Sequence, residues 1–126
     1  MGPEAKFYRE IKKNFKELSL IRIENSSLLG TPDLLVCNTS GHFRTIEIKV
    51  TKGNKVRFSP HQIAFHVKHP DNTFILVKAL SLNSIKLYEG KVIKELDAQG
   101  LRLEACSSGL EACFSRLAAC GLPLEA

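Results

Sequence analysis

The chain has 126 residues and a net charge of +5, a length that suits one domain with a single hydrophobic core. Its hydrophobic content of 44% and charged content of 25% are ordinary for a globular protein. No apolar run approaches the roughly 18 residues that span a bilayer, and no secretory signal pattern opens the chain. The cysteines have neither CxxC pairing nor histidines at ligand spacing, which argues against a zinc site or a disulfide framework and indicates a reducing cytoplasm. They are Cys37, Cys106, Cys113 and Cys120.

The positive charge is concentrated in one part of the chain. Residues 1–94 carry 16 basic and 8 acidic side chains, whereas residues 95–126 carry 2 and 5. No acid lies between Glu47 and Asp71, a span that holds five basic side chains. Such an excess favours a polyanionic partner, most simply nucleic acid, although a solvated basic face would have the same composition. The candidate nucleic-acid contacts are Lys52, Lys55, Arg57, Ser59, His61 and Gln62.

The first predicted element is a helix over residues 3–18. Pro3 suits the first helical position, and apolar side chains follow at helical spacing from Tyr8 to Leu18. Glu4 lies one turn before Tyr8, on the inward stripe, where an acid is unexpected. It either stabilises the helix N-terminus or reaches a site from this helix.

Three strands are predicted next, over residues 20–23, 34–37 and 43–50. Residues 38–41 supply turn residues between the second and third strands, so these two form a hairpin. Asp33 precedes the second strand and follows the turn-forming sequence Gly-Thr-Pro of residues 30–32.

A basic loop over residues 51–58 leads to a second helix that ends near residue 69. Ser59 is the predicted N-cap, Pro60 the first helical residue, and Gln62 the partner in a capping box. Gln62 could instead contact substrate or water, and the two roles are compatible. Strands are predicted over residues 74–80 and 84–88, followed by a short polar turn or helix to residue 97. His61, His66 and His69 are expected on the helix surface rather than on a metal.

The tail over residues 99–126 has a different pattern, and we expect it to be separate from a domain over residues 1–98. Leucine and cysteine recur three apart with a seven-residue period, which is an apolar stripe on a helix. We expect this helix to pack on the domain or on a partner; a self-standing coiled coil is the alternative. Three repeats carry the pattern: residues 103–106, 110–113 and 117–120.

Two carboxylates and a lysine form the candidate catalytic set. Glu47 and Lys49 leave the same face of one strand because side chains alternate, and the hairpin brings Asp33 close to them. Phosphodiester hydrolysis needs a nucleophilic water and neutralisation of the charge that builds on phosphate, and a divalent ion held by hard oxygens supplies both. We therefore expect Asp33, Glu47 and the Ile48 backbone carbonyl to hold Mg²⁺ or Mn²⁺, with Glu4 as an outer ligand. Lys49 would orient the water or stabilise the transition state.

The ordered set Pro32-Asp33 and Glu47-Ile48-Lys49 resembles the PD-(D/E)XK nuclease superfamily. With Glu4 on a first helix and Ser-Pro-His-Gln at residues 59–62, the sequence is similar to the stand-alone VRR-NUC (virus-type replication–repair) nucleases of phages. It also resembles archaeal Holliday-junction resolvases. The resemblance covers roughly residues 3–80 and excludes the tail.

This resemblance implies an α/β fold with an αβββαβ core, that is, a central mixed sheet flanked by helices. It implies a metal-dependent endonuclease that acts as a homodimer on branched DNA or replication and repair intermediates, in the host cytoplasm if the gene belongs to a phage. By the same resemblance Asp33 and Glu47 are metal ligands, Lys49 is the catalytic lysine, Glu4 the helix carboxylate and Gln62 the glutamine of the following helix.

Two alternative functions remain open at this point. A sequence-specific restriction-like or homing endonuclease would share the chemistry and differ in substrate. A non-catalytic DNA-binding or assembly module would use the basic loop and the tail, but it would have no use for carboxylates that face phosphate.

Overall fold

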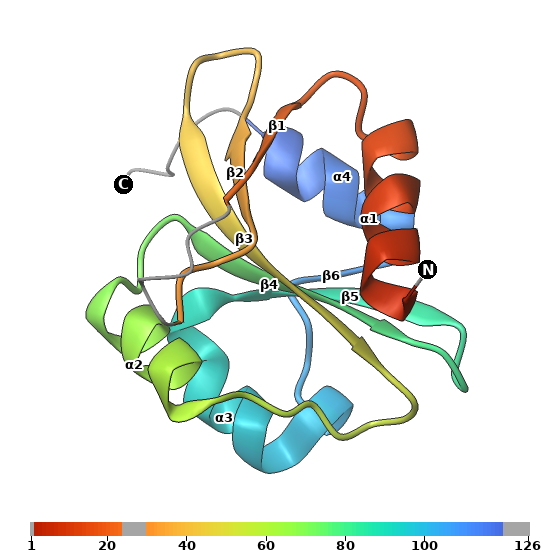
Figure 1. Ribbon diagram of the computed structural model, residues 1–126, viewed down its shortest axis with the longest axis vertical. Coiled ribbons are helices and arrows are strands. Elements are labelled where there is room, and N and C mark those ends of the chain that lie inside the picture. The colour runs from red at the N-terminus through yellow and green to blue at the C-terminus, as the bar shows by residue number, and fades with distance from the viewer. Residues whose placement is uncertain (1, 24–29, 120–126) are drawn as a thin grey trace.

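The computed structural model describes residues 2–23 and 30–119, which form one six-stranded mixed sheet flanked by helices (Figure 1). The strands follow one another across the sheet in chain order. Their bounds are β1 Ser19–Arg22, β2 Leu34–Cys37, β3 Phe43–Thr51, β4 Thr73–Ala79, β5 Ser84–Glu89 and β6 Ser107–Ser108. The helices are α1 Pro3–Asn14, α2 Pro60–Lys68, α3 Ile93–Gln99 and α4 Leu110–Ala118, with short 3₁₀ turns at Gly90–Val92 and Gly100–Arg102.

The connections form the predicted αβββαβ core. Strands β1, β2 and β3 are an antiparallel meander, and α2 carries the chain from β3 to β4, which lies parallel to it. Strands β5 and β6 then continue the sheet antiparallel. The bounds of β1 to β5 agree with the predicted strands to within one residue.

Two hydrophobic clusters cover opposite faces of the sheet, because alternate side chains of β4 point to opposite sides. Helices α1 and α4 lie together on one face (Figure 1), where Phe7 and Ile11 share a cluster with Cys113 and Leu117. Helix α3 and the turn after it pack on the other face of β4 and β5, and α2 lies beside them. Within the described residues no helix is long and apolar enough to cross a bilayer.

Helix α1 ends at Asn14, so its predicted extension to residue 18 is wrong. The backbone leaves the helical region at Phe15 (φ −103°, ψ 48°), and the Leu18 amide then donates to the Phe15 carbonyl at 3.1 Å. Phe15 and Leu18 are nevertheless buried, because this turn, rather than a continuing helix, directs them into the core.

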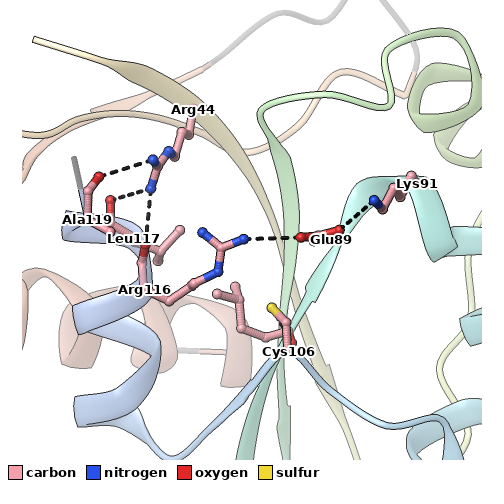
Figure 2. A network of polar contacts seen from close by, with 8 residues as sticks. Arg44, Glu89, Lys91, Cys106, Arg116, Leu117 and Ala119 are labelled. Carbon is pink, nitrogen blue, oxygen red and sulfur yellow. Dashed lines mark hydrogen bonds and ion pairs between the residues drawn. The ribbon is translucent and has the colours of Figure 1, made fainter. Parts of the chain in front are cut away.

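The C-terminal segment adds β6 and α4 to the sheet and its core. Helix α4 begins after Gly109, and the earlier members of the seven-residue repeat, Leu103 and Cys106, lie outside it. Figure 2 shows how α4 is attached: the buried Arg44 of β3 donates to the carbonyls of Arg116, Leu117 and Ala119. These carbonyls lie at the C-terminal end of α4, where backbone carbonyls have no hydrogen-bond partner within the helix.

Strand β3 is longer than its neighbour β2, and this difference creates an open edge. The last β2–β3 pair is Leu34 with Ile46, whereas β3 continues to Thr51. Pro32 is a physical reason for the early end of β2, since proline has no backbone N–H to donate. Among the described residues, the second half of β3 therefore pairs with β4 alone.

Candidate active site at the open edge of β3

Asp33 lies immediately before β2. Its side chain pairs with the backbone of β3 at a position that β2 does not reach. Its backbone carbonyl accepts from the Ile23 amide at 2.8 Å, and its carboxylate Oδ2 accepts from the Ile48 amide at 2.8 Å. Gly30 allows this arrangement because its φ of +83° suits glycine and because a Cβ there would collide with the His61 carbonyl of α2. The Gly-Thr-Pro-Asp segment is thus held against the first turn of α2.

Glu47 is the buried carboxylate of the cluster, with 3% of its surface exposed. Its Oε2 accepts from the Gln62 side-chain amide at 2.9 Å, and its Oε1 has no hydrogen-bond partner within the described residues. Burial, followed by the negative charge of Asp33, raises the pKa of Glu47 to about 9. A buried carboxylate with a second, half-buried carboxylate beside it indicates a site suited to a positive charge.

Gln62 connects the two elements of the site. Its side-chain oxygen accepts from Lys49 Nζ at 3.1 Å and from the Ser59 amide at 2.9 Å, while its backbone amide donates to the Ser59 hydroxyl at 3.2 Å. The predicted capping box is therefore present, and the same side chain also contacts Glu47 and Lys49. Lys49 Nζ lies 5.2 Å from the centre of the Phe58 ring as well.

Glu4 approaches the site from the first turn of α1. Partial burial, with the charge of Asp33 as the second cause, raises the pKa of Glu4. Glu4, Asp33 and Ile48 line a common cavity of about 30 Å³, which is room for about one water molecule. The structure thus brings Glu4 to the cluster, as the sequence predicts.

Among the described residues, no group of three or more histidine, cysteine, aspartate and glutamate side chains is close enough to form a metal site. The residues nonetheless fit a hard divalent cation, because Glu47 Oε1 is buried and unpaired and Asp33 lies beside it. The Ile48 amide points to the open edge, and by strand geometry the Ile48 carbonyl leaves on that same edge.

A groove of about 540 Å³ leads away from this cluster. It is lined by Glu4 and Lys49 and by the loop that follows β3, including the predicted nucleic-acid contacts Lys52, Lys55 and Arg57. Ser59 and His61 are exposed but lie outside this lining, at the start of α2.

The fold has known counterparts. The structure of Hjc, a Holliday junction resolvase from the archaeal hyperthermophile Archaeoglobus fulgidus, matches with a TM-score of 0.50 over 67% of this chain and 73% of that chain, at 16% identity. The chain therefore has the restriction-endonuclease-like fold. A solved VRR_NUC domain aligns with a TM-score of 0.49 at 24% identity, over 72% of this chain and 94% of that one. No family model matches the sequence, and no curated protein does.

The structure adds two residues to the site that the sequence does not reveal. Tyr8 and Arg22 line the small cavity with Glu4 and Asp33, and the Arg22 guanidinium lies 5.0 Å from the Tyr8 ring centre. Tyr8 is at an apolar position of the helical pattern, so the sequence indicates a core residue rather than a site residue. Arg22 pairs with Leu34, next to Asp33, so the strand register was the signal that could have found it.

The predicted surface position of His66 is wrong. Its side chain is fully buried, and its Nδ1 lies 2.9 Å from the Gln62 carbonyl. Burial lowers its pKa, so the neutral ring donates from Nδ1. Gly90 allows the close packing, since a Cβ there would collide with Thr73 and crowd the His66 ring.

We expect Gln62→Ala to reduce cleavage by about 10–100-fold, because it removes the contacts with both Glu47 and Lys49. It also removes the side-chain half of the capping box, the bond from the Ser59 amide, at a cost of about 1 kcal/mol. Ser59→Ala loses the hydroxyl half of the same cap and is the matched control. Urea unfolding should show similar losses of stability in the two variants, and cleavage kinetics a loss at least tenfold smaller for Ser59→Ala. Equal losses of cleavage would mean that Gln62 acts only as a cap.

Proposed function

We propose that this chain is a Mg²⁺- or Mn²⁺-dependent DNA endonuclease that hydrolyses phosphodiester bonds in branched DNA or in replication and repair intermediates. The observation that carries the proposal is the connected polar cluster at the open edge of β3. In it Gln62 contacts both a buried, half-unpaired Glu47 and Lys49, while Asp33 lies beside Glu47. A module that only binds DNA gains nothing from burying the Glu47 carboxylate, with Asp33 beside it, next to a phosphate site.

Asp33, Glu47, the Ile48 carbonyl and Glu4 would hold the metal ion. When bound, such an ion lowers the pKa of a water molecule and neutralises charge on the phosphate. The Ile48 amide keeps Asp33 in place, and the Gln62 side chain keeps both Glu47 and Lys49 in place. Lys49 then presents its ammonium to the attacking water or to the phosphate oxygens.

The substrate and the assembly belong to the same proposal. Hjc is described as a Holliday junction resolvase, and this supports a four-way junction as the first substrate to test. A homodimer, which the resemblance implies, would place two such sites on one branched molecule. We place every catalytic group within residues 1–98 and assign β6 and α4 of the C-terminal segment a stabilising role.

The test is to incubate the purified protein with labelled linear, flap and four-way-junction DNA in Mg²⁺, Mn²⁺ or EDTA. We expect cleavage that requires metal and that is fastest on a branched substrate. Discrete bands from plasmid DNA would instead indicate sequence recognition. Binding of all three DNAs without metal-stimulated cleavage would contradict the endonuclease and favour a binding module.

A further inference from the structure

The groove next to the cluster follows the free edge of β3. Its lining includes four basic side chains and one acid, Glu4. Val50 lies in the lining two residues after Ile48, so by strand alternation its backbone groups face the same open edge. No strand of the described chain pairs with β3 on that edge beyond Ile46. The groove therefore combines the edge-facing backbone of Val50 with cationic walls, since the Ile48 amide already donates to Asp33.

The basic loop that forms one wall is attached to the rest of the fold through its backbone. The Leu80 and Ser81 amides donate to the Thr51 and Lys52 carbonyls, both at 2.8 Å. On the other side the Leu101 amide donates to the Asn54 carbonyl at 2.8 Å. Bonds from two separate elements thus fix the loop before any ligand arrives.

Gly100 is the residue that lets the loop come this close. Its φ is +64°, and a Cβ at this position would collide with the Asn54 carbonyl. Gly100 lies in the turn after α3, far from the cluster in sequence, yet it determines where the loop backbone lies.

We propose that this groove binds the phosphate backbone of one DNA strand beside the bond that is cleaved, with the cations of the loop held in preset positions. The inference rests on the proposed function and deepens it, since it identifies the surface on which the DNA strand lies. A fixed loop loses little conformational entropy on binding, so its charges contribute more to affinity than those of a mobile loop would.

The test is DNA binding in EDTA, where no cleavage interferes. The probes are a fluorescein-labelled 20-nucleotide single strand and its duplex, titrated at several salt concentrations. In the variant Lys52, Lys55 and Arg57 are all replaced by glutamine. The matched control replaces Lys12, Lys13 and Lys16, which are exposed at the other end of α1 and after it, by glutamine.

We expect the groove variant to bind about 10–100-fold more weakly near 50 mM salt than the wild type. The slope of log K against log salt should become shallower by about 2, since each phosphate contact contributes roughly 0.7–0.9. The control should keep the wild-type slope, although its net charge is the same as that of the groove variant. Equal slopes in the two variants would overturn the inference.

Failure of the inference and failure of the proposed function give different results. Metal-dependent cleavage by the wild type together with an unchanged salt slope in the groove variant would overturn the proposal that the groove binds DNA. The proposed endonuclease function would still stand. A shallower slope in a protein that cleaves nothing would support the groove and contradict the endonuclease.

Gly100→Ala tests the preset position of the loop with every charge retained. We expect a shallower salt slope and at least threefold weaker binding at a temperature where circular dichroism shows the variant to be folded. A general loss of stability would leave the slope of the folded fraction unchanged. A folded Gly100→Ala variant with the wild-type slope would overturn the role assigned to the loop.

Discussion

Replacing Glu47 by glutamine is expected to abolish cleavage and, at the same time, to stabilise the metal-free protein. The substitution removes a proposed metal ligand, so we expect cleavage to fall by about 10³-fold or more. The amide has nearly the same shape as the carboxyl group, so the contact with Gln62 can be kept, while the cost of burying a charge beside Asp33 disappears.

The effect on stability depends on pH in a defined direction. Glu47 has a pKa of about 9 in the folded protein against 4.5 as its ordinary value. Between pH 4.5 and pH 9 the folded protein therefore holds a proton on Glu47 that the unfolded chain has released. The contribution of Glu47 to stability is therefore full below pH 4.5 and is lost as the pH rises toward 9. Glu47→Gln removes this decline, and we expect the variant to gain about 1–3 kcal/mol at pH 8.

Urea unfolding in EDTA at pH 5, 7 and 9 measures the difference between the wild type and Glu47→Gln. Glu17→Gln, which changes an exposed glutamate, is the charge-matched control and should leave both cleavage and the pH slope as in the wild type. Added Mg²⁺ should stabilise the wild type and not Glu47→Gln, because only a bound ligand shifts the unfolding equilibrium. A stability difference that stays constant with pH would contradict the assignment.

Arg44→Ala is expected to cost about 3 kcal/mol or more and to lower Tm by roughly 10 °C. Only 4% of Arg44 is exposed, and its guanidinium donates at 3.1, 2.9 and 3.1 Å to the last carbonyls of α4 (Figure 2). The positive charge also meets the negative end of the helix dipole. Truncation would remove this donor from the buried Leu117 carbonyl and the part-buried Arg116 carbonyl. The Ala119 carbonyl would keep its bond from the Asn38 side-chain amide at 2.8 Å.

Arg116→Ala is the matched control: Figure 2 shows Arg116 in the same network, and its contact with Glu89 is more exposed than those of Arg44. Arg116 pairs with Glu89 at 3.1 Å, and about a third of each side chain is exposed. Such pairs contribute about 0–1 kcal/mol. Thermal unfolding followed by circular dichroism should therefore separate the two variants clearly; similar losses would mean that Arg44 does not hold α4.

The sequence predicts the core strands well because their patterns are local. The apolar run that becomes β2 and the turn after it specify a hairpin, and the Ser-Pro-x-Gln start of α2 specifies its cap. Helix periodicity is less reliable: it extends α1 past Asn14, because the buried residues of the turn that begins at Phe15 follow the same spacing. His66 was misplaced for a related reason, since a pocket built by Thr73 and Gly90 lies far away in sequence.

The sequence by itself determined the proposed catalytic set, namely two carboxylates, a lysine and a glutamine in an ordered set on a predicted hairpin and helix. Alternation along one strand was enough to place Glu47 beside Lys49. Only the tertiary structure decided the rest. The early end of β2 opens the edge of β3, the Gly30 contact brings Asp33 to α2, and Gly100 positions the basic loop. These features arise from contacts between distant segments, which local spacing does not encode.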